Sequence, residues 1–188
     1  MPYQTYQNPD GSVVKGYSPT IERFRAAQEY IDFFGRSILD LGCNICSFGM
    51  QAAIAGASSV VGMDENEEAL SKGYEIAQAF SPPLNVRFTC ADIEGDWDFC
   101  PDIVVASMIL HWMKNPKGLV RKCFESAKET LIIIYRYPTD YPGEIGWRPE
   151  VDELNKAVGT NASIVRVLED DGPNRVVMCI YDKEIRQN

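Results

Sequence analysis

The stretch Ser37-Ile38-Leu39-Asp40-Leu41-Gly42-Cys43-Asn44-Ile45-Cys46-Ser47-Phe48-Gly49 decides the fold of this 188-residue chain. A short apolar run leads to an aspartate, a glycine turn follows, and a helix-like segment then begins. This order is typical of a strand that leads into a helix in an open α/β fold, where ligands bind at the junction. The glycine lets a ligand approach the backbone, and the new helix offers free N–H groups and the positive end of its dipole.

Strands and helices alternate through the rest of the chain, which predicts an α/β fold built on a doubly wound sheet. We expect strands at 37–41, 59–64, 86–90, 102–107 and 130–135, and a final antiparallel pair at 163–168 and 175–182. We expect helices at 20–34, 47–56, 66–79, 116–127 and 149–158. The first of these helices places Phe34 on its apolar face and is capped by Ser18 or Thr20. The polar residues 1–18, with a turn at 8–11, form a small hairpin or an arm.

Length and composition are those of a single globular domain over residues 1–188, with an N-terminal arm and helix at 1–35 and a core at 36–188. The formal net charge of −9 disfavours a polyanion such as nucleic acid as a partner. No apolar run approaches the length of a membrane span, and the N-terminus lacks the features of a signal peptide. We therefore expect a cytoplasmic protein that does not contact a membrane.

The six cysteines show no secreted-disulfide framework. Cys43 and Cys46 form a lone C-x-x-C motif. A redox pair and half of a zinc site are possible functions for it, but we prefer the interpretation of two small residues in a tight turn. His111 is the only histidine, and no second C-x-x-C motif exists, so we expect no metal site. Free thiols indicate a reducing compartment.

Three carboxylates fall at the carboxyl ends of three successive predicted strands, at Asp40, Asp64 and Asp92. Right-handed crossovers place such strands side by side, so their ends face one crevice. Each aspartate alone is more simply a turn former or a helix cap, and Asp64 could cap the helix of residues 66–79. Three of them in register with a glycine turn favour a ligand site instead.

The local chemistry at these strand ends fits ribose and adenine. Asp64 is placed to accept hydrogen bonds from two ribose hydroxyl groups. Asp92 can accept one from an exocyclic amine, with the N–H of Ile93 as donor to a ring nitrogen. A dinucleotide fits less well, because Asn44 stands where the second glycine of a pyrophosphate-binding Gly-x-Gly-x-x-Gly motif would be. This absence disfavours a nicotinamide oxidoreductase.

Four segments in order resemble the class I S-adenosylmethionine-dependent methyltransferases. The turn at 39–44 resembles the glycine-rich first motif, 61–64 the acidic strand end that binds ribose, 90–93 the adenine-contacting segment, and 102–112 the fourth-strand motif. The resemblance covers about residues 37–135 and is specific only when the four are taken together. It implies a mostly parallel seven-stranded sheet with helices on both faces and the last strand inserted antiparallel.

The resemblance also implies roles for residues toward the cofactor S-adenosylmethionine. Asp40 and the backbone of Gly42, Cys43 and Asn44 would hold the methionyl part, Asp64 the ribose, Asp92 and Ile93 the adenine, and Ser107 would line the donor pocket; Glu65 is a further candidate for the ribose. Asn44 and Cys46 stand where this family usually has glycine. Arg23 either pairs with the cofactor carboxylate or, as we prefer, is exposed to solvent.

The acceptor side is predicted after the fourth and fifth strands. His111 is a candidate general base or a pocket-lining imidazole. Trp112, Tyr135 and Arg136 are candidate acceptor contacts, and Trp147-Arg148 extends this aromatic and basic stretch. Such residues suit a planar or an anionic acceptor. A loop packed over the sheet edge is the alternative.

These observations predict an enzyme that transfers a methyl group to oxygen or nitrogen of a small molecule. One alternative is an RNA or other nucleic-acid methyltransferase, which requires Lys114, Lys117, Arg136 and Arg148 to converge on one face. Another is a catalytically inactive, methyltransferase-like subunit that only binds the cofactor.

Overall fold

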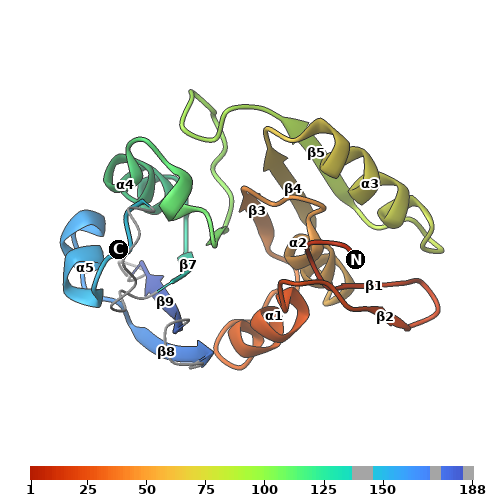
Figure 1. Cartoon of the computed structure of the whole chain (residues 1–188), viewed down its shortest axis with the longest axis horizontal. Coiled ribbons are helices and arrows are strands. Elements are labelled where there is room, and N and C mark those ends of the chain that lie inside the picture. Colours follow the sequence, from red (N-terminus) through yellow and green to blue (C-terminus); the bar gives the residue numbers. More distant parts are fainter. Residues whose placement is uncertain (137–145, 170–174, 184–188) are drawn as a thin grey trace. The chain divides into compact units, whose positions relative to one another are not determined.

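Seven strands form a mostly parallel sheet flanked by helices in the computed structural model, which describes residues 1–136, 146–169 and 175–183 (Figure 1). The chain divides into two units, Met1–Trp97 and Asp98–Asn188, and the strands divide between them. The first unit holds the order β5-β4-β3, and the second holds β6-β7-β9-β8.

The first unit contains a hairpin, three parallel strands and three helices. Their bounds are β1 Tyr6–Gln7, β2 Val13–Val14, α1 Thr20–Gln28, β3 Ser37–Leu41, α2 Ser47–Ile54, β4 Ser59–Asp64, α3 Glu67–Gln78 and β5 Val86–Cys90. The hairpin confirms the turn predicted at residues 8–11, which Gly11 closes by donating its N–H to the Asn8 carbonyl at 3.0 Å. Figure 1 shows this hairpin beside α1.

The parallel register of β3, β4 and β5 aligns their carboxyl ends. Asp40 pairs with Gly62 across β3 and β4, and Asp64 pairs with Cys90 across β4 and β5. Four of the five residues of β3 are buried, as expected for a strand covered on both faces. The prediction that these three strands lie side by side is therefore confirmed.

Helix α1 is shorter than predicted, and its cap is different. It ends at Gln28, and the chain turns so that Phe33, rather than Phe34, enters the core against Phe24 and Phe48, with ring centroids 4.9 and 6.2 Å away. Phe34 is 72% exposed. Pro19 occupies the N-cap position, and no side chain caps the helix. Burial of the aromatic cluster outweighs the helical periodicity, because a fully buried aromatic ring contributes several kcal/mol, roughly 2–3.

The second unit contains the rest of the sheet. Its elements are β6 Ile103–Ser107, the 3₁₀ helix η1 Leu110–Trp112, α4 Pro116–Ser126, β7 Thr130–Arg136, α5 Val151–Val158, β8 Ile164–Glu169 and β9 Val176–Asp182. Strands β6 and β7 are parallel, and β9 lies between β7 and β8, antiparallel to both. This arrangement confirms the last strand as an antiparallel insertion.

Helices α4 and α5 lie in contact with each other in the second unit, as Figure 1 shows. The α4 helix begins at Pro116, after Asn115 accepts a hydrogen bond from the Gly118 N–H at 3.0 Å. Among the described residues, no helix has both the length and the apolar character that crossing a membrane requires.

Candidate functional site

The turn between β3 and α2 carries three left-handed residues in alternation. Gly42, Asn44 and Cys46 have φ values of 62°, 53° and 60°. The turn is held by its own backbone, because Cys46 N–H donates to the Cys43 carbonyl at 2.7 Å and Cys43 N–H donates to the Met63 carbonyl at 3.1 Å. The N–H groups of Cys43, Asn44 and Cys46 therefore all bond within the protein, which fixes the shape of the turn.

The structure explains how Cys46 fits where a glycine is usual. A β-carbon placed on Gly62 would lie 2.6 Å from Cys46 Sγ, and one on Gly49 would lie 2.5 Å from it. Two glycines on neighbouring elements thus leave room for the sulfur atom. The turn keeps its positive φ at position 46 with a side chain present, so the departure from glycine does not remove the turn.

Both thiols of the C-x-x-C motif are buried and free. Burial is the main cause that raises the pKa of Cys43 well above its usual value. A buried, protonated thiol reacts poorly. The motif packs the turn, which agrees with two small residues in a tight bend.

Asp40 is a support for the turn in this structure. Its side chain is 2% exposed, and Oδ2 accepts hydrogen bonds from Gly49 N–H at 3.0 Å and from Cys46 Sγ at 3.6 Å. Burial raises the pKa of Asp40 to about 7, although the Gly49 N–H opposes this shift. In this structure Asp40 fixes the start of α2, and its implied contact with the methionyl part stays a prediction.

Asp64 ends β4 and is half-buried, with both carboxylate oxygens engaged by backbone N–H groups. Oδ2 accepts from Asn44 at 2.7 Å, and Oδ1 accepts from Asn66 at 2.9 Å. The cap of α3 is Asn66, whose side chain accepts from Ala69 N–H at 3.0 Å. Asp64 is therefore not the helix cap, and a carboxylate has further lone pairs for a ligand. Glu65, the second ribose candidate, is exposed.

Asp92 and Ile93 follow β5 at the edge next to Asp64. Asp92 is exposed, and its Oδ1 accepts from Glu94 N–H at 2.8 Å. Ile93 is buried, and its carbonyl accepts from Trp97 Nε1 at 2.9 Å. The Ala91 N–H donates to the Asp64 carbonyl at 3.1 Å, so the chain beyond β5 still follows the end of β4. Together with the glycine turn, these acidic side chains fit a nucleoside with hydroxyl and amino donors.

The N-terminal arm is attached to the start of α2, a contact for which no local sequence pattern exists. Gln4 Oε1 accepts from Ser47 N–H at 3.3 Å, and Ser47 Oγ donates to the Thr5 carbonyl at 2.6 Å. Arg23 is 5% exposed and donates to Ser18 Oγ at 2.8 Å. The preferred interpretation of Arg23 as a solvent-exposed residue is wrong, because it anchors the arm.

In the second unit, β6 ends at the half-buried Ser107, and His111 and Trp112 follow in η1. The two rings lie 4.8 Å apart, and the Trp112 side chain is 70% exposed. The pKa of His111 is lowered to about 4, first by burial and then by the positive charges of Arg148 and Arg136. The imidazole is therefore neutral at neutral pH.

Basic residues from three segments meet around η1. Gly146 packs against the backbone of His111 so closely that a β-carbon would overlap the His111 carbonyl. Lys117 at the start of α4 places Nζ 5.8 Å from the centroid of the Trp147 ring. The positive charges of Arg136 and Arg148 both lower the pKa of His111, so these two residues of the predicted basic stretch lie in its surroundings.

Tyr135 is corrected from a candidate acceptor contact to a core residue. Its side chain is 1% exposed, and it pairs with Val177 across β7 and β9. A hydrogen bond from Tyr135 is one of the interactions that lower the pKa of the neighbouring Cys179 thiol, although burial raises that pKa to about 11 overall. The tyrosine occupies an inward position of a central strand, so Trp112 is the accessible aromatic ring of the predicted set.

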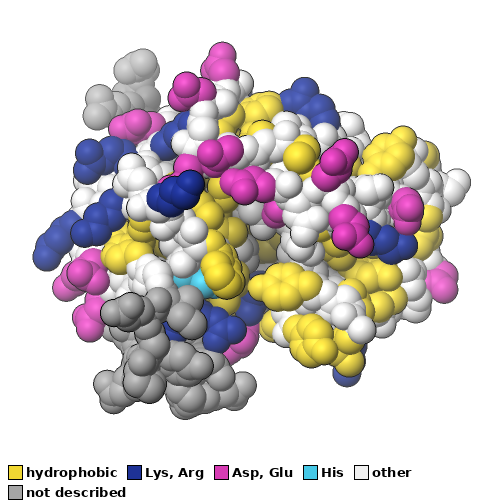
Figure 2. Space-filling view, turned by 45° about the horizontal axis from the view of Figure 1, so that its top comes forward, with side chains coloured by type: hydrophobic (Ala, Val, Ile, Leu, Met, Phe, Trp, Pro, Cys, Tyr) yellow, Lys and Arg dark blue, Asp and Glu magenta, His cyan; other side chains and the backbone are white. Residues whose placement is uncertain are grey.

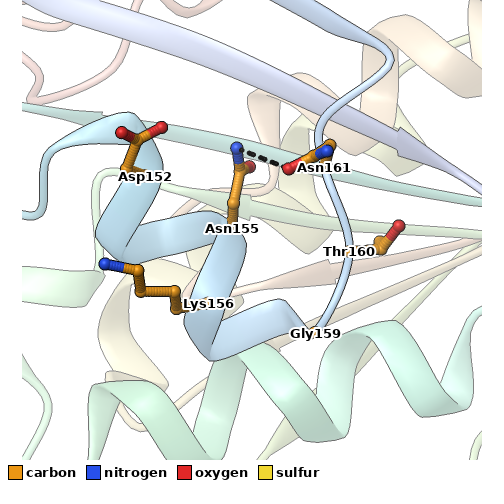
Figure 3. Close-up of a pocket in the computed structure, with 6 residues that line it drawn as sticks. All are labelled: Asp152, Asn155, Lys156, Gly159, Thr160 and Asn161. Atoms are coloured by element: carbon orange, nitrogen blue, oxygen red, sulfur yellow. Dashed lines mark hydrogen bonds between the residues drawn. The ribbon is translucent and has the colours of Figure 1, made fainter.

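A separate cavity of about 450 Å³ lies where α5 ends, and Figure 3 shows its polar lining. Asn155 points toward Asn161, to which its Nδ2 donates at 3.5 Å, and its Oδ1 accepts from Tyr181 OH at 2.9 Å. None of the predicted site residues lines it; the lining comprises Asp152, Asn155, Lys156, Gly159, Thr160 and Asn161. We assign the Asn155 contacts to joining α5 to β9.

The chain is similar to known methyltransferases in its sequence pattern and in its fold. A family model described as a methyltransferase domain matches residues 38–130. No curated protein sequence matches the chain. Among solved structures, the magnesium protoporphyrin IX methyltransferase from Synechocystis PCC 6803, with bound S-adenosylhomocysteine, has a TM-score of 0.72 at 16% identity, covering 88% of this chain and 81% of that one.

Two further structures share the fold. An S-adenosylmethionine-dependent methyltransferase from Mesorhizobium loti has a TM-score of 0.71 at 17% identity, covering 86% of this chain and 96% of that one. The cyclase SpnF has a TM-score of 0.73 at 13% identity, covering 95% and 86%. The matched domain identifies the chain as a class I S-adenosylmethionine-dependent methyltransferase with S-adenosylmethionine as its cofactor, and the solved structures show that it shares their fold.

Proposed function

We propose that this methyltransferase acts on an oxygen or nitrogen atom of a small-molecule acceptor in the cytoplasm. The observation that carries this proposal is the position of His111, which is half-buried in η1 after β6 and lies 4.8 Å from the exposed Trp112 ring. Free thiols at Cys43, Cys46, Cys90, Cys100, Cys123 and Cys179 agree with a reducing compartment.

The cofactor residues are proposed on the geometry of the first unit. Asp64 binds the ribose hydroxyl groups, Asp92 and Ile93 bind the adenine, and the backbone from Gly42 to Asn44 approaches the methionyl part. The positive φ values and the Asn44–Asp64 hydrogen bond support these assignments. Asp40 stabilises the turn by accepting a hydrogen bond from the Gly49 N–H.

The chemistry requires one proton acceptor at most. When bound, the cofactor supplies an electrophilic methyl group on a sulfonium, and alignment of the acceptor supplies much of the rate. A neutral imidazole can take the proton of an acceptor hydroxyl group as the new bond forms, or the proton that a neutral amine nitrogen loses after it has gained the methyl group. His111 has the required charge state at neutral pH because burial and two arginines suppress its protonation. Trp112 offers an exposed ring for a planar acceptor.

A nucleic-acid acceptor is the runner-up, because Lys117, Arg136 and Arg148 gather near η1. The net charge of −9 opposes it. Figure 2 shows acidic side chains among the basic ones on the face that it displays. The alternative of an inactive cofactor-binding subunit is based on Cys46, which stands where a glycine is usual. The turn keeps its positive φ at Cys46 and has room for the sulfur atom, so this residue does not remove the turn.

The test is production of S-adenosylhomocysteine with a panel of hydroxyl and amine acceptors, followed by mass spectrometry of the product. His111→Asn should lower turnover of a hydroxyl acceptor by about 10²–10⁴-fold, with cofactor binding unchanged. Arg121→Gln, on the exposed side of α4, is the matched control and should leave turnover unchanged. Equal turnover in wild type and His111→Asn would remove the proposed role of His111. Cofactor binding without turnover on any acceptor would favour the inactive subunit.

A further inference from the structure

A tryptophan side chain holds the turn that follows β5. Asp92 and Ile93 begin this turn, and the Gly95 N–H donates to the Asp92 carbonyl at 3.1 Å. Nε1 of the half-buried Trp97 donates to the Ile93 carbonyl at 2.9 Å. All of these residues belong to the first unit. The indole group is therefore bonded to the segment that we assign to the adenine.

One peptide group connects Trp97 to the carboxylate of Asp92. The carbonyl of Ile93 and the N–H of Glu94 belong to the same planar peptide group, in which they point in opposite directions. The carbonyl accepts from Trp97 Nε1, and the N–H donates to Asp92 Oδ1 at 2.8 Å. A rotation of this plane that breaks the bond to Trp97 also turns the Glu94 N–H away from Asp92.

We propose that Trp97 is a positioning residue that makes the cofactor site selective for a purine with an exocyclic amine. Through the peptide group between Ile93 and Glu94, it holds the Asp92 carboxylate in the place where that carboxylate accepts a hydrogen bond from the amine. This inference rests on the proposed function, because it deepens the assignment of Asp92 and Ile93 to the adenine. Trp97 acts through these residues and needs no contact with the cofactor.

The different burial of the two adenine residues explains why Asp92 needs support. Ile93 is 4% exposed, so its backbone is fixed by packing, whereas Asp92 is exposed. Ordering a side chain costs conformational entropy, and a restraint that exists before binding lowers the part of this cost that binding has to meet. A donor and an acceptor discriminate between bases only while they keep their relative position. The Trp97 hydrogen bond therefore contributes to discrimination as well as to affinity.

The test compares two ligands that differ at one position of the base. S-adenosylhomocysteine carries the exocyclic amine, and S-inosylhomocysteine carries a carbonyl oxygen there, which cannot donate to Asp92. Isothermal titration calorimetry of the full chain with each ligand gives the ratio of the two dissociation constants. Wild type should prefer S-adenosylhomocysteine by about 10–100-fold. Trp97→Phe, which keeps an aromatic ring but lacks the donor, should reduce this ratio by about 3–10-fold.

A double variant tests the path through Asp92. Asp92→Ala should also lower the ratio, and Trp97→Phe should change it no further when both substitutions are present. Tyr74→Phe, at an exposed aromatic residue of α3, is the control and should keep the wild-type ratio. A loss of stability alone does not change the ratio of two affinities of the folded protein. The ratio therefore separates a positioning role from a merely structural one.

A second measurement on wild type applies even if the Trp97→Phe protein does not fold. The chain has three tryptophans, so the indole N–H signal of Trp97 in an NMR spectrum is the one that is present in both Trp112→Phe and Trp147→Phe. S-adenosylhomocysteine should slow the exchange of this proton with solvent several-fold, because the bound adenine restrains the turn. S-inosylhomocysteine, at the same degree of saturation, should slow it less.

Three results would overturn the inference and leave the assignment of Asp92 in place. They are an unchanged ratio in folded Trp97→Phe, an equal effect of Trp97→Phe with and without the Asp92 carboxylate, and equal exchange of the Trp97 indole proton with both ligands. Equal affinity of wild type for the two ligands would refute the assignment of Asp92 and the inference with it. No readout involves an acceptor, so failure of the proposed methyl transfer to a small molecule would leave the role of Trp97 intact.

Discussion

The backbone N–H of Asn44 donates to Oδ2 of Asp64 at 2.7 Å and thereby joins the glycine turn to the end of the neighbouring strand. The left-handed backbone of Asn44, with φ of 53°, directs this N–H toward the carboxylate. Asn66 N–H holds the other oxygen at 2.9 Å. The residue that replaces a usual glycine thus helps to position the carboxylate that we assign to the ribose.

Asp64→Ala should weaken binding of S-adenosylhomocysteine by about 10–100-fold, since hydrogen bonds to a charged group contribute roughly 1.5–3 kcal/mol. Isothermal titration calorimetry measures this change. Glu68→Ala, an exposed position in the first turn of α3, is the matched control and should bind as wild type does. An Asp64→Ala protein that is folded and binds with wild-type affinity would contradict the assignment.

Gly62→Ala should lower the free energy of unfolding by about 1–3 kcal/mol, because the new methyl group collides with Cys46 Sγ in a closely packed turn. The double variant Gly62→Ala, Cys46→Ala should recover part of that loss, because removal of the sulfur opens the space. Urea unfolding of the two single variants and the double variant gives the coupling free energy. If the losses in free energy of unfolding of the two single variants add up in the double variant, the Cys46 sulfur atom and a methyl group at position 62 do not compete for the same space.

The strands of the sheet were predictable because their signals are local. β3, β4 and β6 are short apolar runs bounded by glycine, aspartate or serine, and the structure places them within a residue of the expected bounds. The meeting of the carboxyl ends of β3, β4 and β5 at one end of the sheet also follows from parallel topology alone, with Asp40 level with Gly62 and Asp64 level with Cys90. Local pattern and topology therefore indicate the cofactor side of the site.

Features that depend on distant contacts were not predictable. α1 ends early because Phe33 packs on Phe48, a residue of the next helix. Arg23 is buried where it donates a hydrogen bond to Ser18 of the N-terminal arm. Tyr135 is buried on β7, which pairs with β9. The anchoring of the arm on Ser47 joins residues more than 40 positions apart. Such pairings arise from tertiary packing, which no local periodicity encodes.

The stability of the protein should depend on pH through Asp40. Its folded pKa of about 7 lies above the ordinary value of 3.8, so the folded state keeps the proton over a range in which the unfolded chain has lost it. The contribution of this group to the free energy of unfolding is therefore complete below pH 3.8 and is lost as pH rises to about 7.

Asp40→Asn keeps the shape of the side chain and its acceptor for Gly49 N–H but removes the titration. The difference in free energy of unfolding between Asp40→Asn and wild type should therefore increase in favour of the variant as pH rises to about 7 and stay constant above it. Urea unfolding on both sides of pH 7 measures this difference. A constant difference over the whole range would show that Asp40 has an ordinary pKa.

Ser47→Ala should release the N-terminal arm from α2. The substitution removes the 2.6 Å hydrogen bond from Ser47 Oγ and leaves the Thr5 carbonyl without that donor, which costs about 1–3 kcal/mol for a buried group. Hydrogen exchange at residues 3–7 should become faster, while exchange in β3 and β4 should follow only the change in global stability. Ser71→Ala on the exposed side of α3 is the control and should change neither. Unchanged exchange at residues 3–7 in Ser47→Ala would mean that Gln4, the hairpin and Arg23 hold the arm without the serine.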